Sequence, residues 1–99
     1  MRKIESEMVF NVLTGRNWKQ ANTSTHRASS DNAAMMVRLH GHHIATVWNA
    51  CDIRDRWAVE VNTDTLRRWP TRTTMSRLRA LGVDVCTRKG EVLLNGEAI

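Results

Sequence analysis

Several residue types that point to specialised architectures are scarce in this chain, which has one proline, five glycines, two cysteines, one phenylalanine and no tyrosine in 99 residues. Cys51 and Cys86 are not spaced as a metal knuckle or a redox pair, and their strand-like neighbours predict buried free thiols. No apolar run approaches the roughly 20 residues that span a bilayer. Glu5 and Glu7 interrupt the apolar part of the N-terminus, which excludes a signal peptide. We therefore expect a cytoplasmic protein with no membrane partner.

Catalytic signatures are missing as well. The sequence has no nucleophile elbow, no phosphate-binding loop and no paired-carboxylate motif. The five glycines lie where turns need them. We therefore expect no enzyme activity and no catalytic residues.

What the chain does have is size for one domain, residues 1–99, and an excess of arginine. Lys and Arg number 15 against 10 Asp and Glu, a net charge of +5, and twelve of the 15 are arginine. Arginine binds phosphate or carboxylate through two parallel hydrogen bonds. This predicts an acidic partner, either nucleic acid or an acidic protein surface. The alternative is that the charge only keeps the protein in solution.

Periodicity predicts the elements of the first two thirds of the chain. Apolar residues at helical spacing (Ile4, Met8, Val12) predict a helix over residues 3–14 that ends at Gly15. The polar segment 18–32 favours an edge strand through Thr23 and Thr25. A hairpin is predicted over residues 33–50 with its turn at His40-Gly41, followed by a strand over residues 57–62.

The last third predicts a short helical turn, a corner, a helix and a hairpin. Asp64 is the expected N-cap of the turn, which runs through Arg68 to the Trp69-Pro70 corner. A second helix starts at Thr71 or Thr73, buries Thr74, Met75, Leu78 and Leu81, and ends at Gly82. Two strands then meet at a turn over residues 88–90, and Asn95-Gly96 is a further turn signal. The fold class predicted is α+β: a small antiparallel sheet of about five to six strands with two helices packed on one face.

The histidines His40, His42 and His43 surround one turn, where three imidazoles could hold a transition metal. His42 and His43 are adjacent on a strand and so point to opposite faces, and no acidic residue lies within the run. We predict no metal site and no cofactor, and we expect the histidines to fill an exposed hairpin tip.

Tryptophan is abundant, with four copies. We expect Trp48 and Trp57 in the core. Trp18 and Trp69 adjoin basic residues, where burial is the ordinary expectation and exposure would suit stacking on a base or anchoring a protein interface.

The stretch from Thr65 to Val83 holds five arginines and no acidic residue. Residues 71–81 are similar to the recognition helix of helix-turn-helix proteins, and the following basic hairpin is placed like the wing of a winged helix. The segment before it is too short for a full first helix, so a solvated arginine face on a structural helix is the alternative. We expect the arginine side chains to project outward together. The predicted binding residues are Arg67, Arg68, Trp69, Arg72, Ser76, Arg77, Arg79, Arg88 and Lys89.

A second resemblance covers most of the chain. Residues 2–5, Gly15, Asn17, Asn22-Thr23, residues 39–45 and residues 69–82 are similar to short accessory proteins encoded in tailed-bacteriophage genomes. The resemblance implies expression in the host cytoplasm and a role as a modulator or inhibitor of a host protein, such as a nuclease or defence factor. Direct DNA binding through the arginine-rich helix and hairpin tip is the alternative. A homodimer through an uncovered sheet face is a further expected partner.

Overall fold

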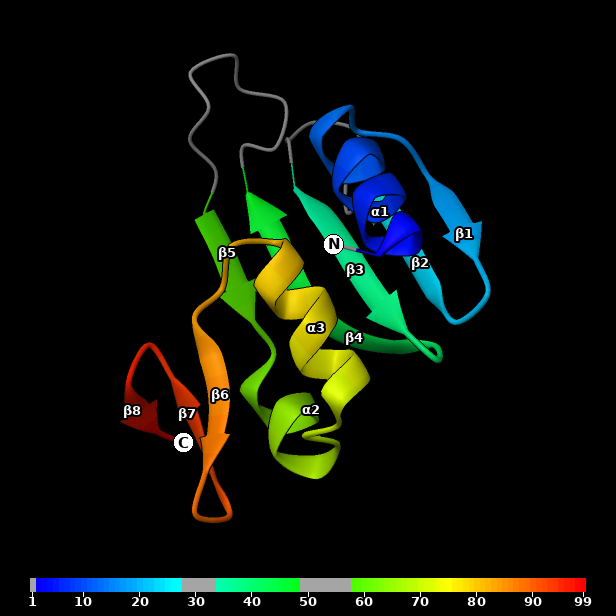
Figure 1. Cartoon of the computed structure of the whole chain (residues 1–99). Helices are drawn as coiled ribbons and strands as arrows, with labels where there is room; N and C mark the ends of the chain where they lie inside the picture. The colour runs from blue at the N-terminus through cyan, green and yellow to red at the C-terminus, as the bar shows by residue number, and fades with distance from the viewer. Residues whose placement is uncertain (1, 28–33, 49–57) are drawn as a thin grey trace.

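The computed structural model describes residues 2–27, 34–48 and 58–99. Within these ranges the elements follow the order helix, five strands, two helices and three strands (Figure 1). Their bounds are α1 (Lys3–Leu13), β1 (Trp18–Gln20), β2 (Thr23–Arg27), β3 (Met35–Leu39), β4 (His42–Trp48), β5 (Ala58–Val61), α2 (Thr63–Arg68), α3 (Arg72–Ala80), β6 (Val85–Arg88), β7 (Glu91–Leu94) and β8 (Glu97–Ala98). None of the helices in the described ranges is long and apolar enough to cross a membrane.

The first five strands form one antiparallel sheet in the order β1-β2-β3-β4-β5. The hairpin predicted around His40-Gly41 is confirmed, and both turn residues have positive φ angles, 53° and 80°. Such a turn matches the twist of the two strands. The pairing shifts register between Val37 and Arg38, which places Ile44 and Ala45 both in the core. A bulge therefore breaks the regular alternation of an ideal strand in β4.

The polar segment after α1 forms two strands where one edge strand was expected. β1 takes the edge, and β2 lies inside the sheet between β1 and β3. Thr23 and Thr25 are fully buried under α1, and the Thr25 hydroxyl donates to the carbonyl of Arg16 at 2.8 Å. The prediction of a weakly buried edge is wrong because hydrogen bonds satisfy the threonine hydroxyls in the interior.

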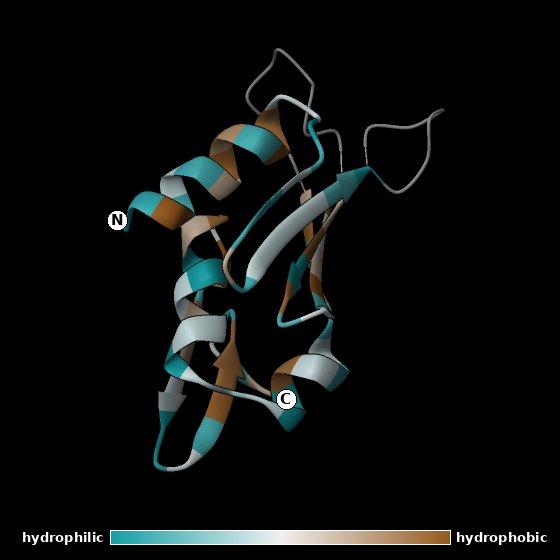
Figure 2. Ribbon diagram, turned by 90° about the vertical axis from the view of Figure 1, so that its right-hand side faces the viewer, coloured by the Kyte–Doolittle hydropathy of each residue, from teal (hydrophilic) through white to brown (hydrophobic). Residues whose placement is uncertain are grey.

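Helices α1 and α3 cover the same face of the sheet, as Figure 1 shows. Apolar and polar residues alternate along α1 (Figure 2), and its buried side chains are Glu5, Met8 and Val12. From α3 the buried side chains are Thr74, Met75, Arg77 and Leu78. The predicted α+β class, an antiparallel sheet with two helices on one face, is confirmed.

The boundaries of the two C-terminal helices depend on caps. Thr71 caps α3 by accepting from the Thr74 amide at 3.2 Å, which confirms one of the two predicted starts. Gly82 follows the helix with φ +91°, and the Val83 amide bonds back to the Leu78 carbonyl at 3.0 Å. The N-cap of α2 is Asn62, so the assignment to Asp64 is wrong. Asp64 lies in the first turn, one residue inside the helix start.

The C-terminal segment does not extend the main sheet. β6, β7 and β8 form a separate antiparallel sheet, in which the predicted turns at Lys89-Gly90 and Asn95-Gly96 are confirmed. The third strand, β8, was not predicted. β6 packs against α3, so this small sheet flanks the helix (Figure 1). Cys86 on β6 is a half-buried free thiol, whereas Cys51 lies outside the described residues.

Trp48 is not in the core as expected. It is 39% exposed on the side of the sheet opposite the helices, and its indole nitrogen donates to Glu60 Oε2 at 3.1 Å. The position follows from the bulge, because Trp48 pairs with Ala58 and shares the side of Thr46 and Glu60. Trp57, the other expected core tryptophan, lies outside the described residues.

Candidate binding surface

An exposed tryptophan marks the corner between α2 and α3. Trp69 is 42% exposed, and its ring stacks on His42 with centroids 4.3 Å apart and planes at 27°. The stack fixes the indole at the edge of a hollow of about 350 Å³, which also involves Leu39, Ile44 and hydroxyls of α2 and α3 such as Thr65. We call residues 67–72 together with His42 the Trp69 corner.

The arginines of the corner differ in their partners. Arg67 pairs with Asp64 at 3.3 Å, but both side chains are largely exposed (53% and 84%), so the pair adds little stability. Arg68 and Arg72 are exposed and have no carboxylate partner among the residues that the structure describes. These two guanidinium groups are therefore available to an external anion.

Arg77 contradicts the expectation that the arginines project outward together. It is 3% exposed, its Nη1 donates to Glu5 Oε2 at 2.8 Å, and its Nε donates to Thr23 Oγ1 at 3.0 Å. The hydroxyl of Ser76 also donates to Glu5. Arg77 and Ser76 thus attach α3 to α1 and β2. Arg77 points inward because positions 74, 77, 78 and 81 share one face of the helix, whereas Ser76 beside it is only half-buried.

The other predicted binding residues are exposed but not gathered with the corner. Arg79 donates its Nε to the Val85 carbonyl at 2.9 Å, which ties its side chain to the start of β6. Arg88 and Lys89 lie at the β6–β7 tip, at the same end of the molecule as α2 (Figure 1). The structure therefore brings Arg67, Arg68, Trp69 and Arg72 together and places Arg79, Arg88 and Lys89 apart from them. It turns the buried Arg77 and the half-buried Ser76 toward Glu5.

The burial of Arg77 also weakens the likeness to a recognition helix. Thr74, Met75 and Arg77, three of the residues that carry it, are buried against the domain's own core. A helix that reads DNA bases must present such positions to the groove.

The buried ion pair sets the state of Glu5. Burial by itself would raise the pKa of this carboxyl, but hydrogen bonds from Ser76, Arg77 and the Arg2 amide, together with the charge of Arg77, outweigh it. The pKa of Glu5 therefore lies below its ordinary value. The pair remains ionised at neutral pH.

Histidines of the hairpin have separate partners. His43 lies between Thr46 Oγ1 (2.8 Å) and the Asn62 side-chain amide (3.1 Å), whereas His42 contacts Trp69. Because Asn62 Oδ1 already accepts from the Thr65 amide at 3.1 Å, its Nδ2 is the atom that donates to His43 Nδ1. Across residues 2–27, 34–48 and 58–99, no three metal-binding side chains converge.

The roles of Glu5 and His42 are not among those predicted from the sequence. Glu5 shares the helical spacing of Met8 and Val12, so a carboxylate on the apolar face of α1 was the available signal for a buried cationic partner. The stacking of His42 on Trp69 joins residues that are 27 positions apart in the sequence, and no local sequence pattern predicts this contact.

This geometry defines a small α+β domain with an aromatic and cationic corner. A family model described as Kyanoviridae Gp96 protein matches residues 1–98. The chain belongs to this bacteriophage family, which confirms the phage resemblance. No curated protein and no solved structure matches the chain.

Proposed function

We propose that this phage protein acts in the host cytoplasm by binding, without catalysis, to a host protein that presents an acidic surface. The Trp69 corner is the proposed contact site, and modulation of the bound protein is the proposed outcome. The observation that carries the proposal is the exposed indole of Trp69, held by His42 beside a hollow and flanked by Arg68 and Arg72, which have no carboxylate partner among the described residues.

Tryptophan and arginine dominate the energetics of protein interfaces, especially where an aromatic ring lies beside a pocket. The stack restricts the indole before binding, so less side-chain entropy is lost on association. A partner side chain can enter the hollow while carboxylates around it meet Arg68 and Arg72. Arginine pairs with carboxylates through two hydrogen bonds, which fixes orientation as well as attraction.

The test is capture from nuclease-treated host lysate, followed by affinity measurement with the purified captured protein. Trp69→Ala should weaken binding about 30-fold or more, the effect of losing a hot-spot residue of about 2 kcal/mol. The matched control is Phe10→Ala, which removes an aromatic ring that is 57% exposed on α1. The control should bind as the wild type does. Equal binding by Trp69→Ala and the wild type would contradict the proposal.

Nucleic acid is the second candidate for the same end of the molecule, because the β6–β7 tip that holds Arg88 and Lys89 lies at this end together with α2 (Figure 1). Capture that nuclease abolishes, that falls steeply between 50 and 200 mM salt and that Arg68→Gln/Arg72→Gln also abolishes would assign the corner to nucleic acid. Capture that survives nuclease would assign it to protein.

A further inference from the structure

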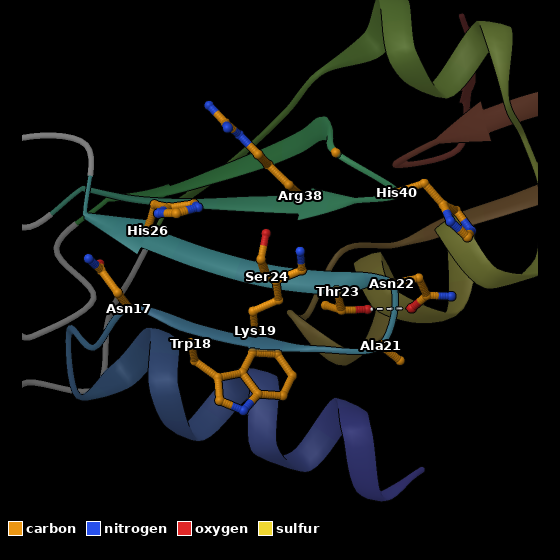
Figure 3. A pocket seen from close by; sticks show the side chains of 11 residues that line it. Asn17, Trp18, Lys19, Ala21, Asn22, Thr23, Ser24, His26, Arg38 and His40 are labelled. Carbon is orange, nitrogen blue, oxygen red and sulfur yellow. Dashed lines mark hydrogen bonds between the residues drawn. The ribbon is translucent and has the colours of Figure 1, made fainter.

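The face of the five-stranded sheet turned away from α1 and α3 carries a second feature, separate from the Trp69 corner. Over β1, β2 and β3 it forms a hollow of about 670 Å³. Figure 3 shows Lys19, Ser24, His26 and Arg38 rising from this face, whereas the ring of Trp18 lies on the α1 side. Lys19, Ser24 and Arg38 are paired across the three strands, so they form a row perpendicular to them.

The row is cationic and unpaired. Neither Lys19 nor Arg38 has a carboxylate partner within the described ranges, and no described carboxylate lines the hollow. The two cations are two strands apart, about 10 Å at the usual strand spacing, with the Ser24 hydroxyl between them. That separation suits two anionic groups along an extended ligand better than a single small anion.

The amides at the rim add donors. The oxygen of Asn17 accepts from the Arg27 amide at 2.9 Å, and the oxygen of Asn22 accepts from the Thr23 hydroxyl at 2.9 Å. Each oxygen is thus occupied by the protein itself, and neither NH₂ group has an acceptor in the part of the chain that the structure describes. The side chains that remain available are mainly donors, which suit the acceptor-only oxygens of phosphate.

Two exposed imidazoles, His26 and His40, lie at opposite ends of the hollow (Figure 3). The bases of single-stranded nucleic acid can stack on histidine rings. Proteins bind single-stranded nucleic acid by combining cations, which contact the phosphate backbone, with flat rings, which stack on the bases. An acidic peptide would use the cations and leave the rings without a role.

We propose that this open-face hollow binds a segment of single-stranded nucleic acid, with Lys19 and Arg38 on two phosphates of the strand and His26 and His40 beside bases. The site shares no residue with the Trp69 corner, although His40 lines both this hollow and the one beside Trp69. Its outcome is therefore independent of the proposed protein partner.

The experiment measures binding of a fluorescent single-stranded oligonucleotide of about twelve nucleotides to the whole protein at several salt concentrations. Two phosphate contacts predict a slope of log K against log salt of about −1.4, or about sevenfold weaker binding at 200 mM than at 50 mM. The double variant Lys19→Gln/Arg38→Gln should lose this salt-dependent binding. Unchanged thermal unfolding of the variant would show that the fold is retained.

The matched control is Arg68→Gln/Arg72→Gln, which removes two charges from the Trp69 corner and should leave oligonucleotide binding unchanged. A duplex of the same sequence should bind less well, because its paired bases cannot reach the imidazoles. The proposal is overturned if the oligonucleotide does not bind. It is also overturned if binding depends on Arg68 and Arg72 alone, or if a nucleoside triphosphate binds while the oligonucleotide does not.

Discussion

Replacing Arg77 by methionine tests whether the buried ion pair, rather than an outward charge, is what this arginine supplies. Methionine keeps much of the volume and removes both donated hydrogen bonds. Glu5, whose side chain is 5% exposed, would then remain ionised in the interior with the Ser76 hydroxyl and the Arg2 amide as its hydrogen-bond donors. Breaking one side of a buried pair costs about 3–5 kcal/mol. Domains of this size have only about 5–15 kcal/mol of stability in total.

The assay is equilibrium unfolding in urea with the thermal midpoint as a second measure. A loss of about 3 kcal/mol in a domain of roughly 100 residues lowers Tm by about 12–24 °C. The matched control is Arg72→Met, the same substitution at an exposed position, which should change stability by less than about 0.5 kcal/mol.

A second comparison separates the cost of an unpaired charge from the worth of the pair itself. The double variant Glu5→Met/Arg77→Met removes both charges, and it should recover much of the stability lost by Arg77→Met alone, because well-packed apolar residues replace buried pairs at little cost. If Arg77→Met is no more destabilising than Arg72→Met, Arg77 is not buried against Glu5 and the placement of α3 on α1 is wrong.

Two further predictions concern Glu5 and a strained turn. Because the pKa of Glu5 is lowered on folding, its stabilising contribution is complete above the ordinary value of 4.5 and is lost as the pH falls through the folded value. The urea midpoint of the wild type should therefore fall more between pH 5 and pH 3 than that of Glu5→Gln, and parallel curves would contradict the assignment. Replacing Ala21, whose φ angle is +52°, by glycine should raise the free energy of unfolding by about 0.5–1 kcal/mol. The same change at Ala80, the last residue of α3, should lower the free energy of unfolding by up to about 1 kcal/mol, and a loss at both positions would refute the strained turn.

The elements of this fold could be predicted because their signals are local. Apolar spacing gave α1, Thr71 and Gly82 bounded α3, and His40-Gly41 marked the central hairpin. Each of these depends on residues within a few positions of one another. Periodicity and turn chemistry describe that range well.

The predictions that are wrong concern residues whose positions depend on contacts with distant parts of the sequence. Nothing near Trp48 reveals the bulge that turns it away from the core, and nothing near Arg77 reveals Glu5, 72 positions earlier. The charge of Arg77 predicts exposure, but the residue lies between Thr74 and Leu81 on the buried face of α3. An arginine on such a face is buried only if a carboxylate pairs with it. Whether a carboxylate lies close enough depends on the tertiary fold and not on the neighbouring sequence.

The Trp69 corner shows the same dependence on long-range contacts. Asn62 caps α2 through its oxygen and holds His43 through its nitrogen, so one side chain joins the start of α2 to the hairpin that carries His42. His42 in turn supports the ring of Trp69. The orientation of the proposed anchor is therefore set by the sheet, which explains how a tryptophan at a two-helix corner can stay exposed in a fixed position.

The contacts of the arginines between Thr65 and Val83 show which of them are free to bind a partner. Of the five arginines between Thr65 and Val83, Arg77 is consumed by Glu5, Arg79 is tied to a carbonyl and Arg67 faces Asp64. Only Arg68 and Arg72 remain without a partner in the described structure, so the total charge of the stretch overstates its attraction for phosphate. We therefore propose a protein surface for the corner, because two free cations lie there beside a braced indole. The open sheet face also carries two cations without a described partner, but the exposed rings of His26 and His40 accompany them, and for this reason we propose single-stranded nucleic acid for that face.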